Sequence, residues 1–437
     1  MEWTNRPVFG RWPEWAGRYR AAAALLAALA ATGGRTAAQQ IPPDTLRLAD
    51  AVALARGDNP ALQSARLAAD AAAERVGPAG AWSDPMVSFG LMNRPLDGFG
   101  TGEAMTMNSI QLTQRIPWPG KLGYARERAE RLADAKALDA DETERQLVAR
   151  VTSAYYQLAF MDRGLTVMRE TRDLLRDFLD VSSTRYAVGE GLQQDVLQAQ
   201  VAVARMTEDI TVMEQNRIAM AARLNALLGR DATVPVDALV LPEPAGVLPP
   251  VDSLMVRAAV ERPALGAARE RAMAAAAGYR SARRQLYPDF TVTLGYGQRP
   301  QYTDMATIMV GVSVPIFAGG SQLPLRRELA AEQAAREAQE RDLYNETFAR
   351  LTELRADAER AARLAALYRD AILPQARAAV ESAFSAYRVG KVDYMTLVDN
   401  ELTVNRYEIE SLRLAADYQR NLAELEAMVG GPIGGTP

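Results

Sequence analysis

Two spacings of apolar residues alternate along the chain, one typical of long helices and one typical of short strands. Between 321 and 386, apolar side chains recur at alternating intervals of three and four, the heptad pattern of a coiled coil. A second helical stretch runs from 119 to 184. At about 65 residues, each stretch greatly exceeds the roughly 8 to 20 residues of an ordinary globular helix. The seam of the later helix is predicted to consist of Tyr344, Thr347, Leu351, Leu354, Ala358, Ala361, Ala365, Tyr368 and Ile372.

A pair of predicted strands precedes each long helix. Apolar and polar residues alternate over 87–91 and 110–112 in the first pair, and over 290–296 and 308–314 in the second. With its flanking residues, each predicted strand has about 8 to 11 residues, the length with which a tilted strand crosses a bilayer. The half-buried sheet of a soluble protein gives the same alternation, so both alternatives stay open at this point.

Landmarks in the first half of the chain recur about 200 residues later, which indicates an internal duplication. Asn-Pro-Ala-Leu at 59–62 returns as Arg-Pro-Ala-Leu at 262–265, and Tyr-Ala-Val-Gly at 186–189 returns as Tyr-Arg-Val-Gly at 387–390. Each repeat is predicted to contain a short helix, a hairpin, a long helix and a medium helix. The predicted boundaries are a signal peptide at 1–38, a first repeat at 39–230, a Pro-rich equatorial connector at 231–252, a second repeat at 253–430 and a flexible tail at 431–437.

The signal peptide is predicted from the order of its parts. Basic residues, among them Arg18 and Arg20, precede an apolar core at 21–31, and small residues at 36–38 supply a cleavage site. The core is too short for a transmembrane helix, which needs roughly 20 residues. Cleavage would remove five arginines and two glutamates and shift the net charge from −4 to −7. Without a basic stripe, a nucleic-acid partner is not expected.

The composition argues against enzymatic chemistry. The 437 residues include neither cysteine nor histidine, the side chains most used for nucleophilic attack, proton transfer and tight metal binding. Gly120-Lys121 resembles the end of a P-loop, but Arg115 stands where its first glycine is required. We therefore predict no catalytic, cofactor-binding or metal-binding residues. The methionines near the first hairpin could offer thioether ligands to Cu(I), but we interpret them as flexible apolar filler: Met86, Met92, Met105 and Met107.

Aromatic residues favour the membrane alternative for the strands. Trp82 and Trp118 are the only tryptophans after the signal segment and bracket the first hairpin, while Tyr287 and Phe317 bracket the second. This placement is typical of the aromatic girdle of a membrane barrel. Because the smallest membrane barrels have about eight strands, four strands from one chain would have to share a barrel with other chains.

These features together resemble the TolC-like outer-membrane factor family over nearly all of the predicted mature chain. The duplicated hairpin and long helix, the two Tyr-x-Val-Gly turns and the segment 194–200 carry the resemblance. It implies a mainly α fold with a membrane β-barrel: a homotrimer whose chains each give four strands to a twelve-stranded barrel in the outer membrane, continued through the periplasm by a tunnel of coiled-coil helices. It also implies outer membrane lipid, a periplasmic adaptor and an inner-membrane pump of the RND type as partners. The function it implies is passive conduction of pumped substrates from the periplasm to the exterior.

The segments 82–86 and 117–121 resemble the heavy-metal efflux branch of this family, many of whose members carry a lipidated amino-terminal cysteine that this chain lacks. A conduit for type I protein secretion remains an alternative within the same fold. An exported soluble coiled-coil scaffold is an alternative of a different class.

The turns after the long helices are predicted to be the periplasmic tips, because each follows its strands by about 70 residues of helix, roughly 100 Å. Gly189 and Gly390 stand where a helix ends in a left-handed residue. The family resemblance implies that the turns also dock the adaptor, and Glu381 is a candidate for a pore constriction. The predicted docking residues are Tyr186, Val188, Gly189, Tyr387, Val389 and Gly390.

Overall fold

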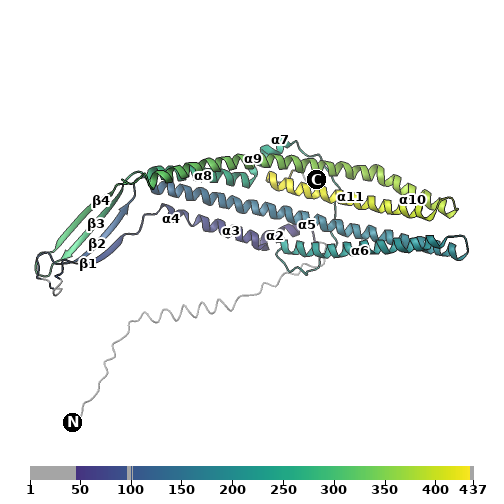
Figure 1. Ribbon diagram of the computed structural model, residues 1–437, viewed down its shortest axis with the longest axis horizontal. Helices are drawn as coiled ribbons and strands as arrows, with labels where there is room; N and C mark the ends of the chain where they lie inside the picture. The colour runs from purple at the N-terminus through teal and green to yellow at the C-terminus, as the bar shows by residue number, and fades with distance from the viewer. Residues whose placement is uncertain (1–45, 96–99, 101, 434–437) are drawn as a thin grey trace, which may run out of the picture. The chain divides into compact units, whose positions relative to one another are not determined.

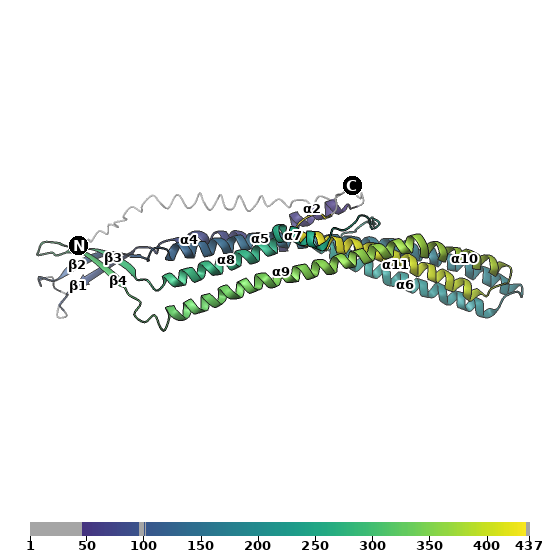
Figure 2. The same ribbon diagram turned by 90° about the horizontal axis from the view of Figure 1, so that it is seen from above.

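The computed structural model describes residues 46–95, 100 and 102–433. Thr45–Pro437 pack as one unit, whereas the predicted signal peptide lies outside the described residues. Within this unit the strands occupy one end (Figures 1 and 2). The other end holds the turn between α5 (Lys121–Ala187) and α6 (Gln193–Leu227) and the turn between α10 (Leu373–Arg388) and α11 (Tyr394–Val429).

The first half of the unit follows the predicted order of helix, hairpin, long helix and medium helix. Its short helical segment is divided at Asn59-Pro60, where Asn59 caps the second piece by accepting hydrogen bonds from the backbone N–H groups of Ala61 and Leu62. The elements are α2 (Leu48–Asp58), α3 (Pro60–Ala73), α4 (Val76–Gly80), β1 (Met86–Met92), β2 (Met107–Ile116), α5 (Lys121–Ala187) and α6 (Gln193–Leu227).

The second half repeats this order, with one interruption in its long helix. A π-helical turn, η2, divides this helix just before Pro374, which has no N–H to give to an α-helical hydrogen bond. The Leu373 N–H instead bonds five residues back, to the carbonyl of Tyr368. The elements are α7 (Val251–Glu261), α8 (Pro263–Arg284), β3 (Asp289–Gln298), β4 (Met305–Ser313), α9 (Gln322–Leu367), η2 (Tyr368–Ile372), α10 (Leu373–Arg388) and α11 (Tyr394–Val429).

The seam predicted for the second long helix is largely buried. Its positions from Thr347 to Ala365 lie in the core, where α9 packs on α8 and α11, whereas Tyr344 is exposed. Within this helix, Glu359 contacts Arg363 four residues later. Other charges bridge helices: Glu332 contacts Arg128 of α5, and Arg350 contacts Glu424 of α11 at 2.7 Å.

The two hairpins pair with each other to form one antiparallel sheet in the order β1-β2-β3-β4. The central pairing, between β2 and β3, joins the two halves of the chain and sets Ile110 opposite Tyr296 and Leu112 opposite Leu294. The strands β1 and β4 are the edges of this sheet.

Equivalent glycines mark the same close contact in both halves. Gly229 after α6 and Gly430 after α11 adopt left-handed backbone, with φ of 72° and 95°. A Cβ at Gly229 would lie 2.4 Å from the carbonyl oxygen of Asp58, and one at Gly430 would lie 2.6 Å from Cβ of Glu261. Each medium helix therefore ends against the end of the short helix of its own half, as expected of a duplicated unit.

The Pro-rich connector is held to both halves of the helical region. The carboxylate of Asp162 on α5 accepts the N–H of Leu239 at 3.1 Å and contacts Arg217 of α6. Farther along, the Tyr418 hydroxyl donates to the carbonyl of Ala245 at 2.7 Å, and Arg355 donates to the carbonyl of Pro249 at 2.8 Å. The connector thus crosses from the α5/α6 pair to the α9/α11 pair.

Residues at the start of the predicted tail also have partners. Arg257 donates to the carbonyl of Pro432 at 3.1 Å, and the N–H of Ile433 donates to Glu426 at 3.3 Å. The last four residues, 434–437, lie outside the described part of the chain.

A buried ion pair fastens the sheet to the longest helix. Lys121, the first residue of α5, places its Nζ 2.7 Å from Oδ1 of Asp289, the first residue of β3, and 2.9 Å from the carbonyl of Tyr287. The same carboxylate oxygen accepts a hydrogen bond from the backbone N–H of Trp118 at 2.9 Å. The Lys121 side chain is buried, so its charge depends on these partners.

We predict that Lys121→Met lowers the free energy of unfolding by about 3 kcal/mol, because it leaves the partly buried Asp289 carboxylate without its cation. Arg363→Met is the matched control, since it removes an exposed partner of Glu359 and is expected to cost less than about 1 kcal/mol. Denaturant unfolding of the full chain in detergent measures both. Equal losses in the two variants would contradict a special role for the junction.

Candidate functional site

The two faces of the sheet differ sharply in polarity. Residues directly opposite one another on paired strands point to the same face. One face is therefore mainly aliphatic and aromatic, with amides at Asn108, Gln114 and Gln298, and the other carries mainly hydroxyl groups, glycines and methionines. A row of the apolar face consists of Val87, Leu112, Leu294 and Ile308, and the next row of the polar face consists of Ser88, Gln111, Gly295 and Thr307.

The apolar face is largely uncovered in the single chain. Phe89 and Ile308 on this face are 80% and 77% exposed, and most of their apolar neighbours are exposed as well. A contiguous apolar surface of this kind marks contact with a membrane or another protein. Since the opposite face is polar, the sheet can separate an apolar environment from an aqueous one.

The predicted interface aromatics flank the helix-side end of the strands. Trp118 stacks on Tyr287 with ring centroids 5.2 Å apart, and it also stacks on Phe290 at 5.8 Å. Trp82 lies before β1 and Phe317 lies after β4, and both are exposed. The structure therefore brings Trp118 and Tyr287 together beside the Lys121–Asp289 pair. Their role at a membrane surface stays a prediction.

The two turns far from the sheet have matching helix ends. Gly189 and Gly390 adopt left-handed backbone with φ of 79° and 72°. In each turn the N–H after the glycine reaches back five residues to a helix carbonyl at 2.9 Å, as in the Schellman motif: Glu190 to Arg185, and Lys391 to Ala386.

The side chains of the two turns are placed differently. Tyr186, Val188 and Val389 are exposed, whereas Tyr387 is only 5% exposed. Tyr387 packs edge-on against Tyr394, and Arg185 of the other turn lies 4.9 Å from its ring centroid and donates to its carbonyl at 3.0 Å. Tyr387 therefore joins the two turns, and the accessible apolar surface comes from the other three residues.

Glu381, the candidate for a constriction, is exposed and lines a pocket of about 380 Å³ between α5, α10 and α11. Phe178 stacks on Phe384 at 5.8 Å in its wall, and Arg377 pairs with Glu408. Glu401 lies deeper and is buried. Burial raises the pKa of Glu401, and the negative charge of Glu408 raises it further.

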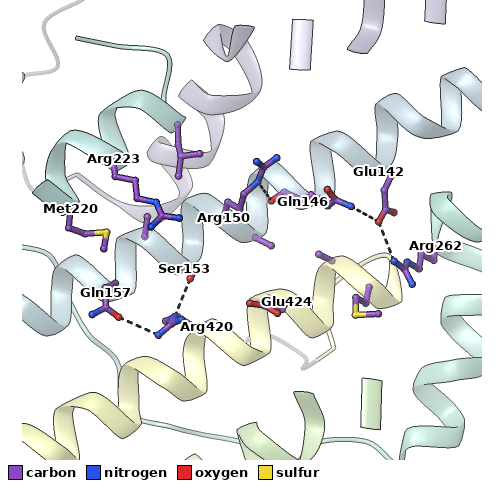
Figure 3. A pocket seen from close by; sticks show the side chains of 15 residues that line it. Glu142, Gln146, Arg150, Ser153, Gln157, Met220, Arg223, Arg262, Arg420 and Glu424 are labelled. Atoms are coloured by element: carbon purple, nitrogen blue, oxygen red, sulfur yellow. Dashed lines mark hydrogen bonds and ion pairs between the residues drawn. The ribbon is translucent and has the colours of Figure 1, made fainter. Parts of the chain in front are cut away.

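A larger pocket of about 750 Å³ lies at mid-height between α5, α6 and α11 (Figure 3). Arginines dominate its charge, and Arg420 donates to the Ser153 hydroxyl at 3.2 Å and to Gln157 at 3.4 Å. The glutamates are engaged, Glu142 with Arg262 and Glu424 with Arg350. A serine beside a guanidinium has no general base, so this pocket lacks the arrangement of a nucleophilic enzyme.

Within residues 46–95, 100 and 102–433, no group of three or more carboxylates could hold a metal ion. In the same part of the chain, no helix combines the length and the apolar character that crossing a membrane requires.

Some residues at these sites could not be found from the sequence. The Lys121–Asp289 pair joins positions 168 residues apart, and neither residue type is unusual at a helix or strand start. The burial of Tyr387 could not be predicted either, because Tyr186 occupies the same position of the same motif and is exposed.

Comparison with known proteins places these features in context. A family model described as "Outer membrane efflux protein" matches residues 51–230 and 254–431, most of the chain in two segments. The pyoverdine export outer membrane protein OpmQ of Pseudomonas putida is 25% identical over 416 residues, which cover 87% of this chain and 85% of that protein.

Solved structures share the fold at low sequence identity. The outer-membrane channel OprN has a TM-score of 0.77 at 19% identity, with coverage of 88% of this chain and 90% of that one. The structure of CusC has a TM-score of 0.73 at 18% identity over 88% and 92%. The outer membrane protein VceC of Vibrio cholerae has a TM-score of 0.75 at 17% identity over 89% and 97%.

We predict that Glu401→Gln raises the melting temperature at pH 8 and reduces its dependence on pH. Folding raises the pKa of the Glu401 carboxyl group. This group therefore makes its full contribution to stability when the pH is below its pKa in the unfolded chain, and the contribution is lost as the pH rises through its pKa in the folded chain. The amide keeps the size of the side chain but has no charge to desolvate.

Thermal melts between pH 5 and pH 8 measure this effect. Glu190→Gln, at an exposed turn position, is the control and is expected to melt like the original protein. An unchanged pH profile in Glu401→Gln would show that the buried carboxyl does not limit stability.

Proposed function

The chain belongs to the outer membrane efflux protein family, and on this premise we propose that it is the outer membrane channel subunit of a tripartite efflux system. In this role it conducts substrates passively from the periplasm to the exterior and catalyses no reaction. The observation that carries the proposal is the single sheet with one apolar and one polar face at the end of a long helical unit.

The sheet supports assembly as a homotrimer. Its edge strands β1 and β4 present unpaired backbone groups, which are costly in a bilayer unless strands of other chains complete the ladder. Four strands from each of three chains give a twelve-stranded barrel, above the minimum of about eight. In this arrangement the apolar face contacts lipid and the polar face lines the pore.

The exposed residues of the two turns supply a docking surface for a periplasmic adaptor, which in turn connects the channel to an inner-membrane pump of the RND type. Tyr186, Val188 and Val389 offer apolar contacts there. Gly189 and Gly390 set the backbone of the turns, and Tyr387 fixes one turn against the other. Glu381, repeated three times in the trimer, narrows the pore near this end.

We assign the duplicated organisation to a first repeat at 39–230, an equatorial connector at 231–252, a second repeat at 253–430 and a tail at 431–437, after a signal peptide at 1–38. The two segments matched by the family model, 51–230 and 254–431, support this division. The equivalent contacts of Gly229 and Gly430 support it independently.

Heavy-metal ions or drugs are the substrates we propose, from the resemblance of 82–86 and 117–121 to the heavy-metal branch. The similarity to a pyoverdine export protein makes pyoverdine a further substrate to test. A gene deletion tests the proposal. Growth of the deletion strain is measured in the presence of copper, silver, zinc, cobalt and common drugs, and its secretion of pyoverdine is measured separately. Wild-type behaviour in every assay, together with absence from the outer membrane, would overturn it.

We predict that the protein purifies in detergent as a trimer and forms ion-conducting pores in planar bilayers. The reason is the four-strand sheet, which cannot close a barrel within one chain. Native mass spectrometry and bilayer conductance measure the two properties. A conducting monomer would contradict the shared barrel, and a protein that is stable and monodisperse without detergent would favour the soluble scaffold.

We also predict that Gly390→Val abolishes efflux while trimers remain in the outer membrane. A β-branched residue is strained at φ of 72°, and the turn lies at the end of the unit opposite the sheet. Gly390→Asn is the matched control, because asparagine tolerates left-handed backbone and should keep efflux. Drug or metal resistance at normal expression measures the outcome, and full resistance in the valine variant would refute the docking role.

A further inference from the structure

The methionines of the sheet all lie on its polar face. Met86 is opposite Thr113, which is opposite Thr293, and Thr293 is opposite Met309, so both methionines share a face with the two threonines. The same alternation puts the other three on this face too. The five methionines in β1 to β4 are Met86, Met92, Met107, Met305 and Met309.

This placement is not expected of apolar filler. A methionine that serves only as a hydrophobic group would be found among the valines, leucines and isoleucines of the apolar face. Met86 and Met309 are instead 61% and 60% exposed, on a surface of hydroxyl groups, amides and glycines. Their thioether groups are therefore available to the water that the polar face contacts.

Three of these methionines lie in the last rows of the sheet, at the end far from the helices. Met92 on β1 is directly opposite Met107 on β2. The sulfur of Met107 lies above Gly297, 2.7 Å from where a Cβ on that residue would stand, and Gly297 is directly opposite Met305 on β4. The missing side chain at 297 thus leaves the space in which Met107 can approach Met305.

The carboxylate next to Met305 has other partners. Asp304, which precedes Met305, accepts a hydrogen bond from the Tyr296 hydroxyl and one from the Arg299 N–H at 3.0 Å. The three thioethers are therefore an uncharged set of soft ligands. Such a set favours soft monovalent ions over hard or divalent ions.

We propose that Met92, Met107 and Met305 form a binding site for soft monovalent metal ions, Cu(I) or Ag(I), on the pore-facing side of the sheet. The proposal rests on the channel function proposed above, because it names a substrate class for that channel. Neutral ligands on an exposed surface bind such ions reversibly, as conduction requires. Each trimer would carry three copies of the site around one pore.

Isothermal titration of the purified full-length channel in detergent with silver nitrate, in chloride-free buffer, tests the site. We expect saturable Ag(I) binding that weakens at least tenfold in the triple variant Met92→Leu/Met107→Leu/Met305→Leu. The matched control replaces three buried methionines away from the sheet, Met161→Leu/Met206→Leu/Met255→Leu, and should bind Ag(I) like the original protein. Equal Ag(I) affinity in the original protein and the triple sheet variant would overturn the proposal.

If the triple variant does not assemble, Gly297→Ala tests the site in its place. This change retains all three sulfurs, but its Cβ displaces the sulfur of Met107, so Ag(I) binding should weaken severalfold. Unchanged affinity in Gly297→Ala would then reject the site.

Bilayer conductance of potassium ions separates this proposal from the channel function. Conducting pores that bind no Ag(I) would reject the site alone, whereas Ag(I) binding by a protein that forms no pores would reject the channel role and leave the site.

Discussion

The pairing of β2 with β3 is the interaction on which the rest of the structure depends, because it fuses the hairpins of two duplicated halves into one sheet. Without it, each half would present an isolated two-stranded hairpin, which is marginally stable at best. The Lys121–Asp289 pair then connects the sheet to the helical region, since Lys121 begins α5 in the first half and Asp289 begins β3 in the second. The sheet and the helical region are thus joined across the duplication as well as along the chain.

The lengths of the helices explain how the two halves stay in contact along the whole unit. The 67 residues of α5 span about 100 Å, and no single partner covers them. On one side, α3 and α4 contact the half of α5 near the sheet, and α6 contacts the half near the turns. On the other side, α8 contacts the half of α5 near the sheet, and α11 contacts the half near the turns. The ends of the shorter helices meet at mid-height, where Gly229 and Gly430 permit close approach and the connector crosses.

Features governed by periodic spacing could be predicted from the sequence. The buried seam from Thr347 to Ala365 and the alternation of the strands follow from local geometry, and the left-handed glycines follow from the ends of helices. Contacts between distant segments could not be predicted. The pairing of Arg350 with Glu424 depends on which helix lies beside α9, and the sequence alone does not give that arrangement. For the methionines, alternation along each strand gives the face, but only the strand register shows that Met92 lies opposite Met107 and that Gly297 lies opposite Met305.

The differences between the two halves are as informative as their likeness. Both turns end in the same glycine geometry, yet Tyr186 is exposed while Tyr387 is buried against Tyr394 and held by Arg185. The π-helical turn before Pro374 and the pocket with Glu381 and Glu401 also involve the second half. Duplication would produce identical hairpins, and the departures gather in α10 and α11 toward the end opposite the sheet. In the trimer proposed above, two kinds of helical hairpin would surround the pore, so the end opposite the sheet would combine a surface for the adaptor with a separate, charged constriction.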